Sequence, residues 1–76
     1  MGKTKTLEKV PLQIEAKITP RGDNMPFQLI YEDEIIEIVN PVKSIRLYDG
    51  AFRWRCGING QEVELYNLGE EWWTIQ

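Results

Sequence analysis

The chain of 76 residues contains no histidine and only one cysteine, Cys56. A single cysteine cannot form an internal disulfide, and without histidine the usual zinc ligand sets cannot be assembled. The same shortage removes the common acid–base and nucleophile–base pairs of enzymes, and the sequence also lacks a glycine-rich phosphate loop. We therefore expect a protein that is not an enzyme and needs no metal or cofactor.

Long apolar runs are missing as well. None approaches the roughly 18 residues that span a bilayer. The first residues, MGKTKTLEKV, lack the apolar segment of a secretory signal. These observations predict a cytoplasmic protein that does not enter a membrane, and a reducing compartment suits the single free thiol.

The sequence also has no excess of positive charge, since its net charge is −3. This disfavours general binding to nucleic acid or to an anionic membrane, because both attract basic proteins. The charge is unevenly placed. Residues 31–40 carry four acidic side chains, residues 41–60 carry four basic ones against one acidic one, and residues 61–76 carry four acidic ones. A basic segment thus lies between two acidic segments.

What the sequence does contain is a set of short, apolar-patterned runs separated by turn residues. Apolar and polar side chains alternate from residue 9 to residue 19, which predicts a half-buried strand. Residues 1–8 are polar and are expected to form a flexible tail, leaving one β domain at 9–76. Further strands are predicted at 27–31, 35–39, 42–48, 51–58, 61–67 and 72–75.

Two turns predict the register of their hairpins. Asp49-Gly50 and Asn59-Gly60 are strong signals for two-residue loops. Such a loop at Asn59-Gly60 places Cys56 opposite Val63, Trp54 opposite Leu65 and Arg55 opposite Glu64. A two-residue loop at Asp49-Gly50 places Leu47 opposite Phe52, Ile45 opposite Trp54 and Arg46 opposite Arg53. Both loops predict one inner face, made of Ile45, Leu47, Phe52, Trp54, Cys56, Val63 and Leu65.

About six short strands in one small domain cannot form a flat sheet without leaving an apolar face exposed. We therefore predict an all-β fold, a small antiparallel barrel or sandwich, with an SH3-like barrel favoured as an architectural comparison. Proline cannot donate a ladder hydrogen bond, so Asn40-Pro41 is expected to end the strand at 35–39.

The outer face of the predicted meander at 42–67 is the first candidate site. Alternating basic and aromatic side chains suit an anion or the stacked bases of a single-stranded nucleic acid. The alternative is a solvated face on which Glu64 pairs with Arg55, Tyr66 stacks on Arg53 and Glu37 neutralises Arg46. The candidate residues are Arg46, Tyr48, Arg53, Arg55 and Tyr66.

Trp72 and Trp73 form the second candidate site. Consecutive side chains of a strand point to opposite faces, so we expect one tryptophan to be buried and the other to be at least partly exposed. An exposed tryptophan is favoured at interfaces. The alternative is that the outer ring serves stability alone, for example by packing under neighbouring lysine or arginine side chains.

These features predict a non-catalytic protein-interaction module, or a small accessory or regulatory protein, that uses exposed aromatic residues and an unpaired sheet edge. Its partner is expected to be a protein. The alternative is weak binding of single-stranded nucleic acid through the basic and aromatic outer face, which the net charge disfavours. A homodimer formed through open strand edges is compatible with the same residues.

Overall fold

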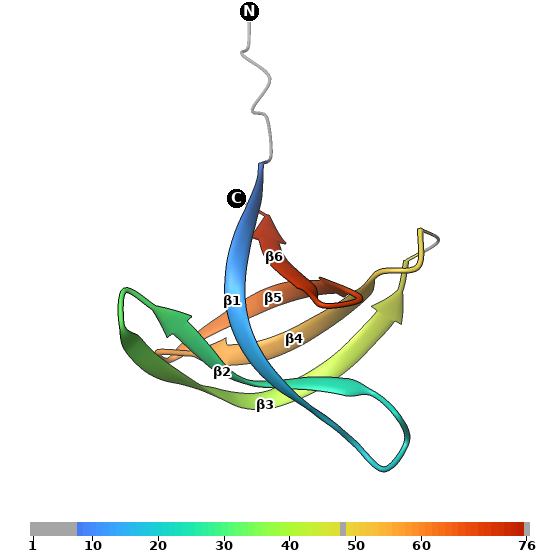
Figure 1. The fold of residues 1–76 in the computed structure, drawn as a ribbon, viewed down its shortest axis with the longest axis horizontal. Helices are drawn as coiled ribbons and strands as arrows, with labels where there is room; N and C mark the ends of the chain where they lie inside the picture. The colour runs from blue at the N-terminus through green and yellow to red at the C-terminus, as the bar shows by residue number, and fades with distance from the viewer. Residues whose placement is uncertain (1–7, 48, 76) are drawn as a thin grey trace, which may run out of the picture.

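The computed structural model of the protein describes residues 8–47 and 49–75 (Figure 1). The predicted N-terminal tail lies, apart from Glu8, outside the described residues, and so does Tyr48. The described residues contain no helix long and apolar enough to cross a membrane. They form six strands: β1 (Lys9–Ile18), β2 (Asn24–Tyr31), β3 (Glu34–Arg46), β4 (Phe52–Ile58), β5 (Gln61–Leu68) and β6 (Glu71–Ile75).

The six strands form a closed antiparallel barrel in chain order. Each strand pairs with the next, and β6 pairs with β1 to close the barrel. The prediction of a small antiparallel β-barrel is confirmed, and this architecture is compatible with the SH3-like comparison. Closure gives each strand an inner face, so a short chain buries its apolar side chains without a second layer.

Two long strands bend and take part in both halves of the barrel. β1 pairs with β6 as far as Leu12 and with β2 from Gln13 onward, and its register shifts between Glu15 and Ala16. β3 pairs with β2 as far as Glu37 and with β4 from Ile38 onward. Bulges of this kind bend a strand and increase its twist, which lets one strand serve both neighbours.

The prediction that Asn40-Pro41 ends a strand is wrong. The chain makes a bulge there, because the pairing with β4 shifts between Val39 and Val42 and Asn40 has φ of 50°. Proline is tolerated at a bulge, where its nitrogen faces no ladder acceptor. The two predicted strands at 35–39 and 42–48 are therefore the two halves of β3.

The predicted register of the β4–β5 hairpin is confirmed. Ile58 and Gln61 flank the Asn59-Gly60 turn, and Cys56 faces Val63 and Trp54 faces Leu65 as expected. Asn59 and Gly60 have φ of 52° and 78°, the positive values that a type I′ turn requires. Local turn chemistry alone thus determines this register.

The predicted register of the β3–β4 hairpin is wrong. Leu47 and Ala51 close the loop, since the Leu47 N–H donates to the Ala51 carbonyl at 2.7 Å. The Ala51 N–H in turn donates to the Asp49 carboxylate at 3.0 Å. This Asx-type bond and Gly50, with φ of 97°, support a loop one residue longer than predicted. Arg46 consequently faces Phe52, so the predicted Arg46–Arg53 pair does not form.

The longer loop also pairs Ile45 with Arg53, so the predicted Ile45–Trp54 and Leu47–Phe52 pairs are wrong as well. A further register shift, between Lys43 and Ile45, places Lys43 opposite Trp54. The predicted inner positions of β4 and β5 hold nevertheless. Phe52, Trp54, Cys56, Val63 and Leu65 all belong to the core or pack against it.

The core lies between β3, β4, β5 and β6, and β1 covers one side of it. Its buried side chains include Ile38, Trp54, Leu65 and Trp72, against which the alternating apolar side chains of β1 pack. The polar side chain of Asn67 is also buried. Its amide donates to the carbonyls of Gly69 and Glu71, at 3.0 and 2.9 Å. These bonds attach the core to the β5–β6 turn.

Candidate protein-interaction surface

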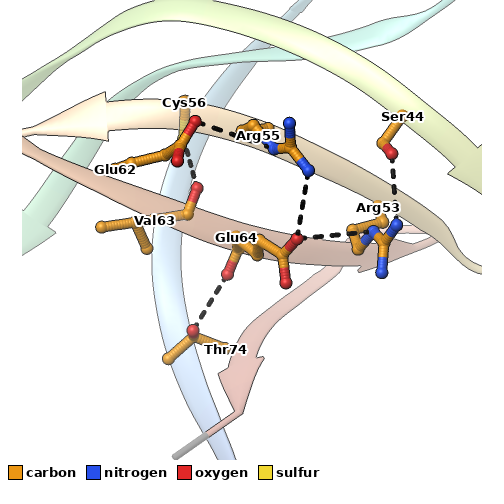
Figure 2. Close-up of polar contacts among 8 residues, drawn as sticks. All are labelled: Ser44, Arg53, Arg55, Cys56, Glu62, Val63, Glu64 and Thr74. Atoms are coloured by element: carbon orange, nitrogen blue, oxygen red, sulfur yellow. Dashed lines mark hydrogen bonds and ion pairs between the residues drawn. The ribbon is translucent and has the colours of Figure 1, made fainter.

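The outer face of β4 and β5 carries a small network of ion pairs (Figure 2). The Arg53 Nε lies 3.8 Å from a carboxylate oxygen of Glu64, and an Arg55 terminal nitrogen lies 3.9 Å from the same oxygen. Arg55 Nε also lies 3.8 Å from a carboxylate oxygen of Glu62. Arg53 donates to the Ser44 hydroxyl at 3.3 Å. Two arginines therefore face two glutamates, with little excess positive charge.

The structure brings together only part of the predicted basic and aromatic face. Arg53, Arg55 and Tyr66 share it, and Glu64 pairs with Arg55 as the alternative interpretation expected. Arg46 does not join them, since its guanidinium carbon lies 5.7 Å from the centre of the Phe52 ring. Among the described side chains, Glu37 forms no ion pair with Arg46. Tyr48 lies outside the described residues.

Trp72 and Trp73 are both buried, with exposed fractions of 6% and 8%. Trp72 belongs to the core, while Trp73 lies on the opposite face of β6 and stacks on Tyr66, with ring centroids 6.0 Å apart. The Lys9 ammonium lies over the Trp73 ring, 4.0 Å from its centroid. The prediction of one partly exposed tryptophan is wrong, because β1 and β5 supply side chains that cover the outer ring.

The edge of β5 is open along more than half of its length. Pairing between β5 and β6 ends at Tyr66 and Trp73, whereas pairing between β6 and β1 continues to Ile75 (Figure 1). Among the described strands, β5 approaches only β4 and β6. The segment from Gln61 to Leu65 therefore has β4 on one side and no described strand on the other.

The register identifies the backbone groups at this open edge. Ile58 and Gln61 close a two-residue loop and so form a hydrogen-bonded pair. Because such pairs alternate along an antiparallel ladder, Glu62 and Glu64 direct their N–H and C=O groups away from β4. In agreement, the Thr74 hydroxyl donates to the Glu64 carbonyl at 3.0 Å from the β6 side (Figure 2). The other outward groups are the Glu64 N–H and both backbone groups of Glu62.

A shallow hollow of about 430 Å³ lies beside this edge. Its acidic wall is formed by Glu62 and Glu64, and apolar atoms come from Val63 and Ile75. The hollow thus offers charged, apolar and backbone hydrogen-bonding groups along one strand. Its complete lining is Arg55, Glu62, Val63, Glu64, Tyr66, Thr74 and Ile75.

Cys56 does not contribute a reactive group to this surface. Its side chain is buried, and burial raises the pKa of its thiol to about 11. The Sγ atom lies 3.7 Å from the Val63 carbonyl, to which the protonated thiol donates. In the described part of the chain, no cluster of three or more histidine, cysteine, aspartate or glutamate side chains is arranged to hold a metal ion.

Sequence reasoning anticipated an unpaired sheet edge but did not locate it. A usable signal was present in the predicted strand lengths, since the run at 61–67 is longer than its neighbour at 72–75. A short strand cannot cover the whole edge of a longer one. No family model, no curated protein and no solved structure matches this chain. Evidence on its function therefore comes from the geometry of its own surfaces.

Proposed function

We propose that this protein is a non-catalytic interaction module that binds an extended segment of a protein partner by strand addition to β5. The observation that carries the proposal is the open edge from Gln61 to Leu65. Strand addition uses the partner's main chain for affinity and alternate side chains for specificity. A module of this kind suits a small accessory or regulatory protein.

The surroundings of the edge support this function. Both outward backbone groups of Glu62 and the outward Glu64 N–H can exchange hydrogen bonds with an added strand, and the adjacent hollow has room for its side chains. Trp72 and Trp73 are buried and hold the barrel together instead of contacting the partner. Tyr66, one of the predicted aromatic residues, lines this hollow.

The proposal of a non-catalytic role rests on the chemistry of the side chains. The sequence contains no histidine, and its only thiol belongs to Cys56, whose pKa is raised by burial. A thiol of this kind is a poor nucleophile at neutral pH. A reduced, unmodified cysteine also suits the cytoplasmic location that we propose for this protein.

Weak binding of single-stranded nucleic acid stays a prediction, and no contact among the described residues favours it. Arg53 and Arg55 lie within 3.9 Å of glutamate carboxylates, which compete with phosphate for the guanidinium groups. Tyr66 stacks on Trp73, so that face of its ring is occupied. We therefore propose strand addition, and not nucleic-acid binding, as the function of this protein.

The test replaces Glu62 with proline, which removes the outward N–H while leaving the β4–β5 ladder in place. We expect Glu62→Pro to lose binding of the native partner, recovered from lysate with the wild-type chain, by about tenfold or more. The matched control, Glu62→Gln, keeps the N–H and should lose at most a few-fold. Equal binding by a folded Glu62→Pro variant contradicts the proposal.

A second measurement does not depend on that variant folding. Hydrogen exchange of the Glu62 and Glu64 amides should slow when the partner binds the wild-type chain, because both N–H groups become donors in a ladder. Slowing confined to other strands, with these two amides unchanged, contradicts strand addition at β5.

A further inference from the structure

Resting on the proposed function, we propose that the β5 edge selects an extended segment in which lysine or arginine alternates with apolar residues. The preference follows from the two faces that an added strand would meet. One face of β5 presents glutamate side chains and the other presents apolar ones.

The acidic face is formed by Glu62 and Glu64. Arg55 on β4 directly faces Glu64 on β5 and forms an ion pair with it. A cation on the added strand, on the other side of Glu64, would give basic, acidic and basic side chains across three neighbouring strands. Further along the ladder, Glu62 faces Gly57, which carries no side chain, and 73% of the Glu62 side chain is exposed. Opposite charges at directly facing positions stabilise a pair of strands.

The apolar face comes from Val63, which lies between these glutamates in the sequence. Val63 is half-buried, packs against the core and lines the hollow. Successive side chains of an added strand point to opposite faces, so a side chain between two cations would lie over Val63. An apolar side chain at this position extends the barrel core past its open edge.

The same charges disfavour a second copy of this chain at the edge. An antiparallel pairing of two β5 strands centred on Val63 places Glu62 of each copy opposite Glu64 of the other. Like charges at facing positions destabilise such a pair, and charged edges protect sheets against self-association. The charges of this edge therefore favour pairing with a basic segment over pairing with β5 of a second copy.

The test uses three blocked seven-residue peptides: Lys-Val-Lys-Val-Lys-Val-Lys, Thr-Val-Thr-Val-Thr-Val-Thr and Glu-Val-Glu-Val-Glu-Val-Glu. Chemical shifts of the Glu62 and Glu64 amides are followed while each peptide is titrated into the full chain. We expect the basic peptide to bind about threefold to tenfold more tightly than the neutral one, and the acidic peptide to bind most weakly. Added salt should reduce this difference.

The variants separate local charge from net charge. Glu62→Gln combined with Glu64→Gln should abolish most of the difference between the basic and neutral peptides. The control combines Glu15→Gln with Glu37→Gln, two exposed glutamates on β1 and β3, and should leave the difference unchanged. An equal effect of both double variants shows a response to net charge alone and overturns the inference.

The outcomes also separate this inference from the proposed function. Equal affinities for the basic and neutral peptides, with both edge amides shifted, overturn the basic preference and leave strand addition standing. If no peptide shifts either amide, both proposals fail. Sedimentation should show a monomer, and a dimer that Glu62→Pro dissociates would show that a second copy occupies the edge.

Discussion

At the scale of single residues, Gly57 on β4 lies directly under the Val39 side chain of β3. A Cβ atom built on Gly57 would lie 2.8 Å from a methyl carbon of Val39, the residue that faces it across the ladder. The φ angle of Gly57 is not positive, so backbone conformation does not require glycine there. Glycine is needed because the Val39 side chain occupies the space above it.

Replacing Gly57 with alanine should therefore destabilise the protein by about 1–2 kcal/mol through overpacking. In a Val39→Ala background the same change should cost close to nothing, because the obstructing methyl groups are gone. Urea unfolding of the two single variants and the double variant measures this coupling as a double-mutant cycle. The same cost in both backgrounds would show that the Val39 contact is not the cause.

Cys56 makes stability depend on pH in the alkaline range. Burial raises the pKa of its thiol from 9.0 to about 11, so the folded state favours the protonated form. The resulting contribution to stability is complete below pH 9, where the thiol is protonated in both states. It is lost as the pH rises through about 11, because the unfolded chain ionises first.

We expect the stability of the wild-type chain, relative to Cys56→Ala, to fall by about 2 kcal/mol between pH 8 and pH 11. Denaturant unfolding of both proteins at each pH measures the difference and cancels the titration of tyrosine and lysine side chains. A difference that stays constant over this range would mean that the thiol is not desolvated in the folded state.

At the scale of the elements, the β2–β3 turn places two residues other than glycine in left-handed backbone conformations. Glu32 and Asp33 have φ of 46° and 68°, left-handed values that glycine adopts freely, that asparagine and aspartate adopt occasionally and that other residues adopt at a cost. Tyr31 faces Glu34 across this turn, so Glu32 and Asp33 are its two central residues. Backbone strain at both central positions should reduce the stability of this hairpin.

Replacing Glu32 with asparagine and Asp33 with glycine should stabilise the protein by about 1 kcal/mol, because both residues suit a type I′ turn. The converse control is Gly60→Ala in the β4–β5 turn, where φ is 78°, and it should destabilise by a similar amount. Thermal unfolding measures both changes. A stability loss in the first variant would indicate that the replaced side chains make contacts that outweigh the strain.

The two hairpins on either side of β4 show how far local signals predict pairing. Asn59-Gly60 forms the expected two-residue loop, and the whole β4–β5 register follows from it. Asp49-Gly50 resembles it in sequence, yet the Asp49 carboxylate binds the Ala51 N–H and supports a longer loop. Because the loop is one residue longer than predicted, Arg46 faces Phe52 and not Arg53. Arg46 therefore does not join the other residues of the predicted basic face.

At the scale of the whole molecule, β1 and β3 make independent unfolding of either half unfavourable. Each strand pairs with different neighbours along its two halves, so loss of one half removes partners from the other. The three tryptophans lie on β4 and β6, whereas Leu29 on β2 packs against the same core cluster. Both halves of the barrel share one core and should unfold together.

We therefore expect urea unfolding followed by tryptophan fluorescence to coincide with unfolding followed by far-ultraviolet circular dichroism. Leu29→Ala, far along the chain from every tryptophan, should lower both midpoints equally, with a cost of about 1–3 kcal/mol. An exposed substitution on β1, Gln13→Ala, serves as the control and should change stability by less than about 0.5 kcal/mol. Separate midpoints for the two signals would show that the halves unfold independently.

The sequence by itself determined the properties that depend on near neighbours. Alternation predicted the inner face of β1, and turn residues predicted a small antiparallel barrel and the β4–β5 register. The tertiary structure alone decided the continuity of β3, the cover over Trp73 and the place where β5 lies open. The continuity of β3 depends on its bulge against β4, and the other two features depend on how β6 lies between β1 and β5, which joins residues that are distant in the chain. No local pattern encodes the side chains that such an arrangement brings together.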